Sequence, residues 1–320
     1  MPVEALPYPL PERGEPARVA FVGQRTYFEA AALHEPAGGL IPAFVDFRPG
    51  GDPDALLEEL DRLRPHAIVA FRPEALPAGA LASVRAPVLG FVTEPLPRPD
   101  RPPHPHYDFN LDRLREGDRN NVDRVALTDP FGWEAAAELL PAWRVMPLPV
   151  DDRLYRTPTP TRRPPRVTFI GYSTMHREQA LVDLKHRFDV RHYAHGLIGE
   201  ELRRVMHDTD VALHIHAEEW IWAFDSNVLR HMAAGHLVIS QTLEPSFGLQ
   251  PDIDYLEVSD RWEMDLRVHQ VFKMPDMYDR IRIRGHHASR QHAASKVWPR
   301  VIRDLFDDLR AFGTERQLAG

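Results

Sequence analysis

Short apolar runs alternate with stretches of helical periodicity along the first half of the chain. The runs are continuous, which is typical of strands buried on both faces of a parallel sheet. They lie at 18–23, 66–71, 87–92, 124–129 and 144–150. Asp52 and Pro53 suit the N-cap and first position of a helix, and one apolar face follows it at Leu56, Leu57, Leu60 and Leu63. This alternation predicts a doubly wound α/β domain.

The same pattern starts again in the second half. A proline- and arginine-rich stretch separates the halves, and the opening RVAFVG returns as RVTFIG. Further strands are expected at 188–193, 211–216, 237–240 and 253–258, and helices near 175–187, 198–207, 225–234, 260–273, 276–291 and 296–311. We therefore expect two Rossmann-type α/β domains facing each other across a cleft. Their ranges are 1–150 and 166–295, with a hinge at 151–165 and a C-terminal segment at 296–320.

Residues 95–109 (PLPRPDRPPHPHYDF) contain too many prolines for a helix or a central strand. They directly follow the strand at 87–92, so we predict a long surface loop at the carboxyl end of that strand. The loop either connects two elements or serves as a lid that contacts a substrate, since long ordered loops are often functional.

Composition narrows the class of protein. The 320 residues suit two domains, and a net charge of −8 with a pI near 6.1 argues against a general nucleic-acid binder. No apolar run approaches the roughly 20 residues that span a bilayer. The chain has no cysteine, which excludes disulfides, thiolate catalysis and cysteine-ligated metals. The first residues lack the features of a secretion signal, so we expect a cytoplasmic protein.

Candidate chemistry gathers in residues 211–248. His214 and His216 end one strand, Asp225–Asn227 open a helix, and Ser240, Gln241, Thr242 and Glu244 leave the next strand. In a doubly wound domain, ligands bind outside the carboxyl ends of the strands and against helix N-termini. This pattern predicts a small-molecule site for an anionic ligand.

A second polar group lies where the strand at 167–170 turns into a helix. Gly171, Ser173 and Thr174 occupy this turn, where free backbone N–H groups and the positive helix end favour a phosphate. Ordinary N-capping by either hydroxyl is the alternative. Arg177, one turn into the helix, either reaches a pyrophosphate or lies on the surface.

Several single residues have two interpretations. His214 and His216 face the same side of their strand, but no third ligand has a recognisable spacing, so we expect no metal and predict that His216 contacts phosphate or sugar. Glu218 and Glu219 lie beside Trp220 and Trp222, which suits either a sugar site or packing under a loop.

Glu94 follows the strand at 87–92. It is either a turn residue or, if burial raises its pKa, a base for an acceptor hydroxyl.

Three passages together carry a family resemblance. PLPVDDRLYRTP (147–158), FIGYSTMHREQAL (169–181) and ALHIH…NVLRHMAAGHLVIS (212–240) resemble parts of GT-B glycosyltransferases of the CgeB-like, glycosyl-transferases-group-1 type. The first is similar to the interdomain hinge, the second to the first strand and helix of the donor domain, and the third to its Asn-containing helix and flanking strands. The resemblance covers about residues 145–310.

The resemblance implies a specific arrangement and activity. The C-terminal domain would bind a nucleotide-sugar donor as co-substrate, the N-terminal domain would bind an unknown acceptor, and the last helix would return to the N-terminal domain. Transfer would need no cofactor or metal. The implied donor site comprises Gly171, Ser173, Thr174, Arg177, Asn227, Arg230, Ser240, Gln241, Thr242 and Glu244, with Glu94, His216 and Glu219 as candidate catalytic groups.

One departure from the family pattern affects function. Many retaining members have two glutamates where this chain has Trp222 and Arg230, and one of them holds the donor ribose. Arginine cannot replace that carboxylate because it only donates hydrogen bonds. Two other functions therefore stay open: an epimerase or phosphorylase on the same fold, or a catalytically silent binding or scaffold protein.

Overall fold

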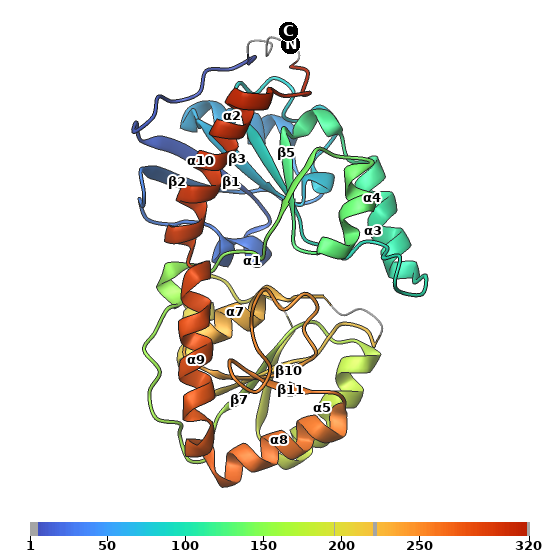
Figure 1. Ribbon diagram of the computed structural model, residues 1–320, viewed down its shortest axis with the longest axis vertical. Coiled ribbons are helices and arrows are strands. Elements are labelled where there is room, and N and C mark those ends of the chain that lie inside the picture. The colour runs from blue at the N-terminus through green and yellow to red at the C-terminus, as the bar shows by residue number, and fades with distance from the viewer. Residues whose placement is uncertain (1–5, 195, 220–222, 319–320) are drawn as a thin grey trace. The chain divides into compact units, whose positions relative to one another are not determined.

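The computed structural model describes residues 6–194, 196–219 and 223–318 (Figure 1). They form two compact units. Unit 1 comprises Met1–Leu148 and Ala294–Gly320, and unit 2 comprises Pro149–Ala293. The predicted hinge at 151–165 is therefore part of unit 2, and the C-terminal segment is part of unit 1.

Unit 1 contains a six-stranded sheet in the order β2-β1-β3-β4-β5-β6, with all neighbours parallel. The strands are β1 (Ala17–Gly23), β2 (Leu40–Asp46), β3 (Ala67–Phe71), β4 (Val88–Val92), β5 (Arg124–Leu127) and β6 (Ala142–Val145). The helices are α1 (Arg25–Phe28), α2 (Pro53–Leu63), α3 (Pro105–Glu116), α4 (Trp133–Ala137) and α10 (Ala294–Phe312).

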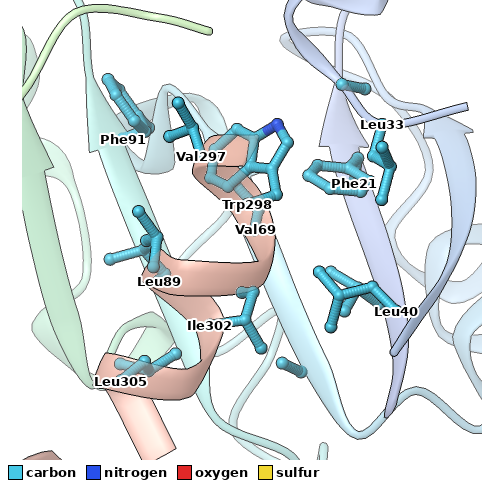
Figure 2. Packing of buried hydrophobic residues seen from close by; sticks show 14 of the residues in the cluster. Phe21, Leu33, Leu40, Val69, Leu89, Phe91, Val297, Trp298, Ile302 and Leu305 are labelled. Carbon is cyan, nitrogen blue, oxygen red and sulfur yellow. The ribbon is translucent and has the colours of Figure 1, made fainter. Parts of the chain in front are cut away.

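The two faces of this sheet are covered by different helices. Alternate strand residues pack with α10 on one face and with α2 and α3 on the other. Figure 2 shows Val297, Trp298 and Ile302 of α10 directed toward the strands that carry Phe21, Val69, Leu89 and Phe91. The Trp298 indole is fully buried and donates a 2.8 Å hydrogen bond to the Ala31 carbonyl. Burial on both faces explains why these strands are apolar throughout.

Unit 2 contains a five-stranded parallel sheet in the order β11-β10-β9-β7-β8. The strands are β7 (Val167–Ile170), β8 (Val190–Tyr193), β9 (Val211–His214), β10 (Leu237–Gln241) and β11 (Leu256–Val258). The helices are α5 (Met175–Arg187), α6 (Gly199–His207), α7 (Ser226–Ala233), α8 (Arg261–Lys273) and α9 (Asp279–Ser289). The α/β prediction is confirmed for both units.

The stretch after residue 149 is attached along unit 2. Arg156 N–H donates to the Ala233 carbonyl at 3.0 Å, and Arg282 donates to the Thr161 hydroxyl at 2.7 Å. Gly235 has a φ of +81°, and a Cβ there would lie 3.0 Å from Pro158 Cα. The glycine after α7 is therefore required both by its backbone conformation and by the chain that crosses over it.

The structure of unit 1 differs from the sequence prediction at two places. Strand β2 was missed because it is a half-exposed edge strand containing Pro42, which an edge tolerates. Residues 105–109 belong to α3 rather than to a loop. Pro105 is the first helical residue, where no N–H is needed, and His104 caps the helix by accepting from His106 N–H at 3.2 Å.

The remaining loop before α3 is anchored at several points. Asn110 donates to the Pro95 carbonyl at 2.8 Å. The buried Arg98 guanidinium pairs with Asp129 at 3.2 Å and lies 4.3 Å from the centre of the Phe131 ring. These contacts hold the segment against unit 1. Among the described helices, none is long and apolar enough to cross a membrane.

Candidate functional site

The carboxyl ends of β7, β9 and β10 bring the predicted donor residues of unit 2 together. Thr174 donates from its hydroxyl to the Ala217 carbonyl at 2.6 Å, which links the start of α5 to the loop after β9. The Gln241 side chain accepts from the His216 backbone N–H at 2.8 Å, which links that loop to β10. The three strand ends therefore form one polar edge, as the sequence predicted.

His214 and Ser240 form the inner part of this edge. The Ser240 hydroxyl donates to the Gln241 carbonyl at 2.6 Å, so it accepts from Nδ1–H of His214 at 2.9 Å. Burial, with help from nearby His216 and Arg177, keeps the pKa of His214 well below its usual value. Ser240 is fully buried, so this geometry makes it a support for His214 and not a surface that a ligand touches.

His216 is neutral and fixed in one tautomer. Its Nε2–H donates to the Thr242 carbonyl at 2.8 Å, which leaves a lone pair on Nδ1. Burial lowers the pKa of His216 to about 4, against the opposing effects of that carbonyl and Asp225. At neutral pH its imidazole can accept a hydrogen bond but cannot act as a proton donor to a leaving group.

Arg177 lies behind the turn that precedes α5. Its guanidinium is buried and donates to the carbonyls of Ile215 and Tyr172, each at 3.0 Å. A Cβ on Gly171 would lie 3.1 Å from Arg177 Nη1, so the glycine makes room for this cation. Burial lowers the pKa of Arg177, opposed by Asp225, Tyr172 and Glu218. Arg177 is therefore not a surface residue, and its guanidinium, held by two carbonyls, supplies a fixed positive charge.

The start of α5 is capped and still polar. Thr174 is the N-cap and accepts from Arg177 N–H at 3.2 Å, so the capping interpretation holds for this residue. Ser173 is exposed and donates to Glu178 at 2.7 Å. His176, which sequence reasoning missed, lies on the first turn of α5, 3.2 Å from Gln241 Nε2. Its position one turn after a strand-to-helix glycine was the available signal.

Helix α7 contributes a second buried cation. Asp225 caps the helix by accepting from Asn227 N–H at 2.8 Å, and Asn227 Oδ1 accepts from Arg230 Nη1 at 3.1 Å. Arg230 is buried, and burial lowers its pKa while Asp225 and Asp151 oppose the shift. Arg230 is thus part of the interior network of unit 2.

The remaining predicted positions lie around this edge. Glu219 is exposed, Glu244 is half-buried before a cis bond to Pro245, and Thr242 presents its carbonyl to His216. Trp220 and Trp222 lie outside the described residues. Within the described ranges 6–194, 196–219 and 223–318, no group of three histidine, aspartate or glutamate side chains is arranged to hold a metal ion.

Glu94 is the predicted site residue of unit 1. It follows β4, and its side chain is 34% exposed, so it lacks the burial on which the base interpretation depended. Its carboxylate lies 3.3 Å from Nη1 of Arg72, which sequence reasoning missed. Burial alone would lower the pKa of Arg72, but Glu94 and Glu74 raise it overall. Unit 1 thus also has charged groups at the carboxyl ends of its strands.

Comparison with known proteins gives matches in structure alone. No family model and no curated protein matches the chain. Sucrose-phosphate synthase from Thermosynechococcus elongatus matches with a TM-score of 0.59 at 11% identity, over 92% of this chain and 99% of its own. HepE from Anabaena, solved with UDP and glucose, matches with a TM-score of 0.58 at 12% identity, over 92% of this chain and 100% of its own. AviGT4, a glycosyltransferase of avilamycin A biosynthesis, matches with a TM-score of 0.55 at 12% identity, over 92% of this chain and 98% of its own. The chain therefore has the α/β fold of the GT-B glycosyltransferases.

Proposed function

We propose that the protein is a glycosyltransferase that moves a sugar from a nucleotide-sugar donor to an acceptor hydroxyl. The observation that carries the proposal is the polar edge of unit 2, where the start of α5, His216 and Gln241 meet in a fold shared with UDP-bound HepE. HepE has also been solved with UDP-glucose, which makes a UDP-hexose the first donor to test. The CgeB-like type and a cytoplasmic location rest on the sequence.

Unit 2 would bind the donor. The N-terminus of α5 offers backbone N–H groups and a positive helix end to the diphosphate. The buried guanidinium groups of Arg177 and Arg230 add fixed positive charge, which stabilises a leaving diphosphate without a metal ion. The lone pair on His216 Nδ1 can accept a hydrogen bond from a hydroxyl of the sugar. No further cofactor is part of this proposal.

Unit 1 would bind the acceptor. In the proposed step the acceptor oxygen attacks C1 of the donor sugar, the bond from C1 to the diphosphate oxygen breaks, and its electron pair leaves with the nucleotide. The acceptor proton passes to a carboxylate. Glu94 is the candidate because it follows β4 and is open to an acceptor, and not because it is buried. Neither the acceptor nor the stereochemical outcome is part of the proposal.

Calorimetry tests the donor assignment directly. Wild-type protein is titrated with UDP-, GDP-, ADP-, TDP- and CMP-linked sugars, and binding of one nucleotide class is expected. His216→Ala should weaken that binding, whereas substitution of the exposed His287, on α9, is the matched control. Product analysis with a labelled donor then separates transfer from epimerisation.

One observation favours a silent binding protein as the second candidate. Arg230 stands where many relatives have a ribose-binding glutamate, and it is buried against Asn227. If none of the five nucleotide classes binds the wild-type protein, the glycosyltransferase proposal is wrong and the scaffold interpretation gains.

A further inference from the structure

Arg72 has an unusual backbone conformation at a strand end of unit 1. It follows β3 directly, its N–H bonds the Phe91 carbonyl at 2.9 Å, and its φ and ψ are 58° and 66°. Residues with a Cβ rarely adopt this left-handed region, and such outliers gather at functional sites. Pro73 follows and disfavours the helical alternative. The chain thus has an arginine where a glycine would fit without strain.

The Arg72 side chain lies between two carboxylates. Its Nε donates to Glu74 Oε1 at 2.9 Å, and its Nη1 is 3.3 Å from Glu94 Oε1. The three side chains differ in exposure: Glu74 is 4% exposed, Arg72 25% and Glu94 34%. One guanidinium therefore joins a buried carboxylate to an accessible one.

Folding accounts for only the first of these contacts. A carboxylate as buried as that of Glu74 needs a cation, because an unpaired buried charge is strongly destabilising. Glu94 is accessible to water, and ion pairs between accessible groups add little stability. The second contact fixes one oxygen of Glu94 and leaves the other without a hydrogen bond among the described residues. That free oxygen can accept a proton.

We propose that Arg72 is a positioning residue that holds Glu94 for deprotonation of the acceptor hydroxyl. This inference rests on the glycosyltransferase function proposed above and adds the residue that orients its base. Arginine suits the role because its planar fork can contact both carboxylates at once in a fixed geometry. Lysine offers only one ammonium group, so it can neutralise Glu74 but cannot also hold Glu94 in place.

The test uses hydrolysis of UDP-glucose, in which water replaces the acceptor and gives up its proton. Arg72→Lys should lower kcat at least tenfold, leave KM for UDP-glucose within twofold, and leave the affinity for UDP unchanged by calorimetry. Glu94→Gln should lower kcat at least as much. The double variant should be no slower than Glu94→Gln alone, because Arg72 acts only through Glu94.

Arg64 provides a matched control. It too is an arginine with positive φ (46°), at the exposed C-cap of α2. Arg64→Lys should leave both kcat and KM as in the wild type. The melting temperature of each variant identifies a loss of folding.

The possible results distinguish a failure of this inference from a failure of the proposed glycosyltransferase function. If the folded Arg72→Lys variant hydrolyses UDP-glucose at the wild-type rate, or if its effect adds fully to that of Glu94→Gln, Arg72 has only a structural role. A wild-type protein that binds UDP but does not hydrolyse UDP-glucose also overturns the inference and leaves the donor assignment intact. A wild-type protein that does not bind UDP overturns both the inference and the choice of a UDP-sugar donor.

Discussion

Acidification should unfold unit 2 because its interior holds neutral histidines. His214 and His216 lie at the polar edge, His231 lies on α7, and His236 lies just after that helix; all four are buried. His236 Nε2–H donates to the Met206 carbonyl at 2.7 Å, so its Nδ1 accepts from His231 Nδ1–H at 3.0 Å. Among the described residues, His231 Nε2 then has no partner. A proton on His236 Nδ1 would remove the acceptor of this hydrogen bond, and a proton on His231 Nε2 would leave a buried positive charge without a hydrogen-bond partner among the described residues.

The pKa shifts set the magnitude and the pH window. Burial lowers the pKa of His216 and of His236 from 6.5 to about 4, and it lowers those of His214 and His231 as well. Near His236, Asp210 opposes the shift and the cations Arg282 and Arg156 add to it.

Between pH 6.5 and about 4, the unfolded chain therefore binds protons that the folded chain does not. Stability is complete above pH 6.5 and is lost as the pH falls through this window. A pKa lowered from 6.5 to about 4 corresponds to about 3 kcal/mol. His216 and His236 together therefore contribute an amount comparable to the 5–15 kcal/mol that stabilises a typical domain.

Urea unfolding at a series of pH values measures this loss, and amide hydrogen exchange assigns it to a unit. The free energy of unfolding should fall steeply from pH 6.5 to 4, with peptides from β9 and β10 losing protection before those from β1 and β3. His231→Gln should make the pH dependence shallower by one proton, about 1.4 kcal/mol per pH unit. The same change at His287, which is already exposed when folded, should not. Equal acid sensitivity of both units would refute the reasoning.

Three further predictions concern stability and binding. Arg316→Met should destabilise unit 1 by about 3–5 kcal/mol in urea unfolding, because the fully buried guanidinium pairs with Asp123 at 3.2 Å and its loss leaves the buried Asp123 carboxylate without that partner. A change under 1 kcal/mol would contradict this. Gly285→Ala should cost about 1–3 kcal/mol by thermal unfolding, because a Cβ would lie 2.3 Å from the Asp254 carbonyl oxygen, and a stabilised variant would show that α9 moves freely. Arg230→Gln should weaken UDP binding by about 1.5–3 kcal/mol in calorimetry, and unchanged affinity with a normal melting temperature would remove Arg230 from donor binding.

The sequence by itself determined the α/β class and the place of the candidate site. Strands buried on both faces must be apolar throughout, so β1, β3, β4 and β7 were visible as continuous runs. Carboxyl ends of parallel strands lie at one edge, so polar residues after β9 and β10 had to gather. Edge strand β2 escaped because it is only half-buried, and α3 escaped because proline in a first helical turn resembles proline in a loop.

Only the tertiary structure decided what the charged side chains do. Arg177 donates to the carbonyls of Tyr172 and Ile215, and His216 donates to that of Thr242, which follows β10. Arg72 is joined to Glu94 although 22 positions separate them in the sequence. Spacing along the chain predicts which residues share a strand end. The direction and partners of a long polar side chain depend on carbonyls and carboxylates contributed by other segments, which become neighbours only when the sheet is assembled.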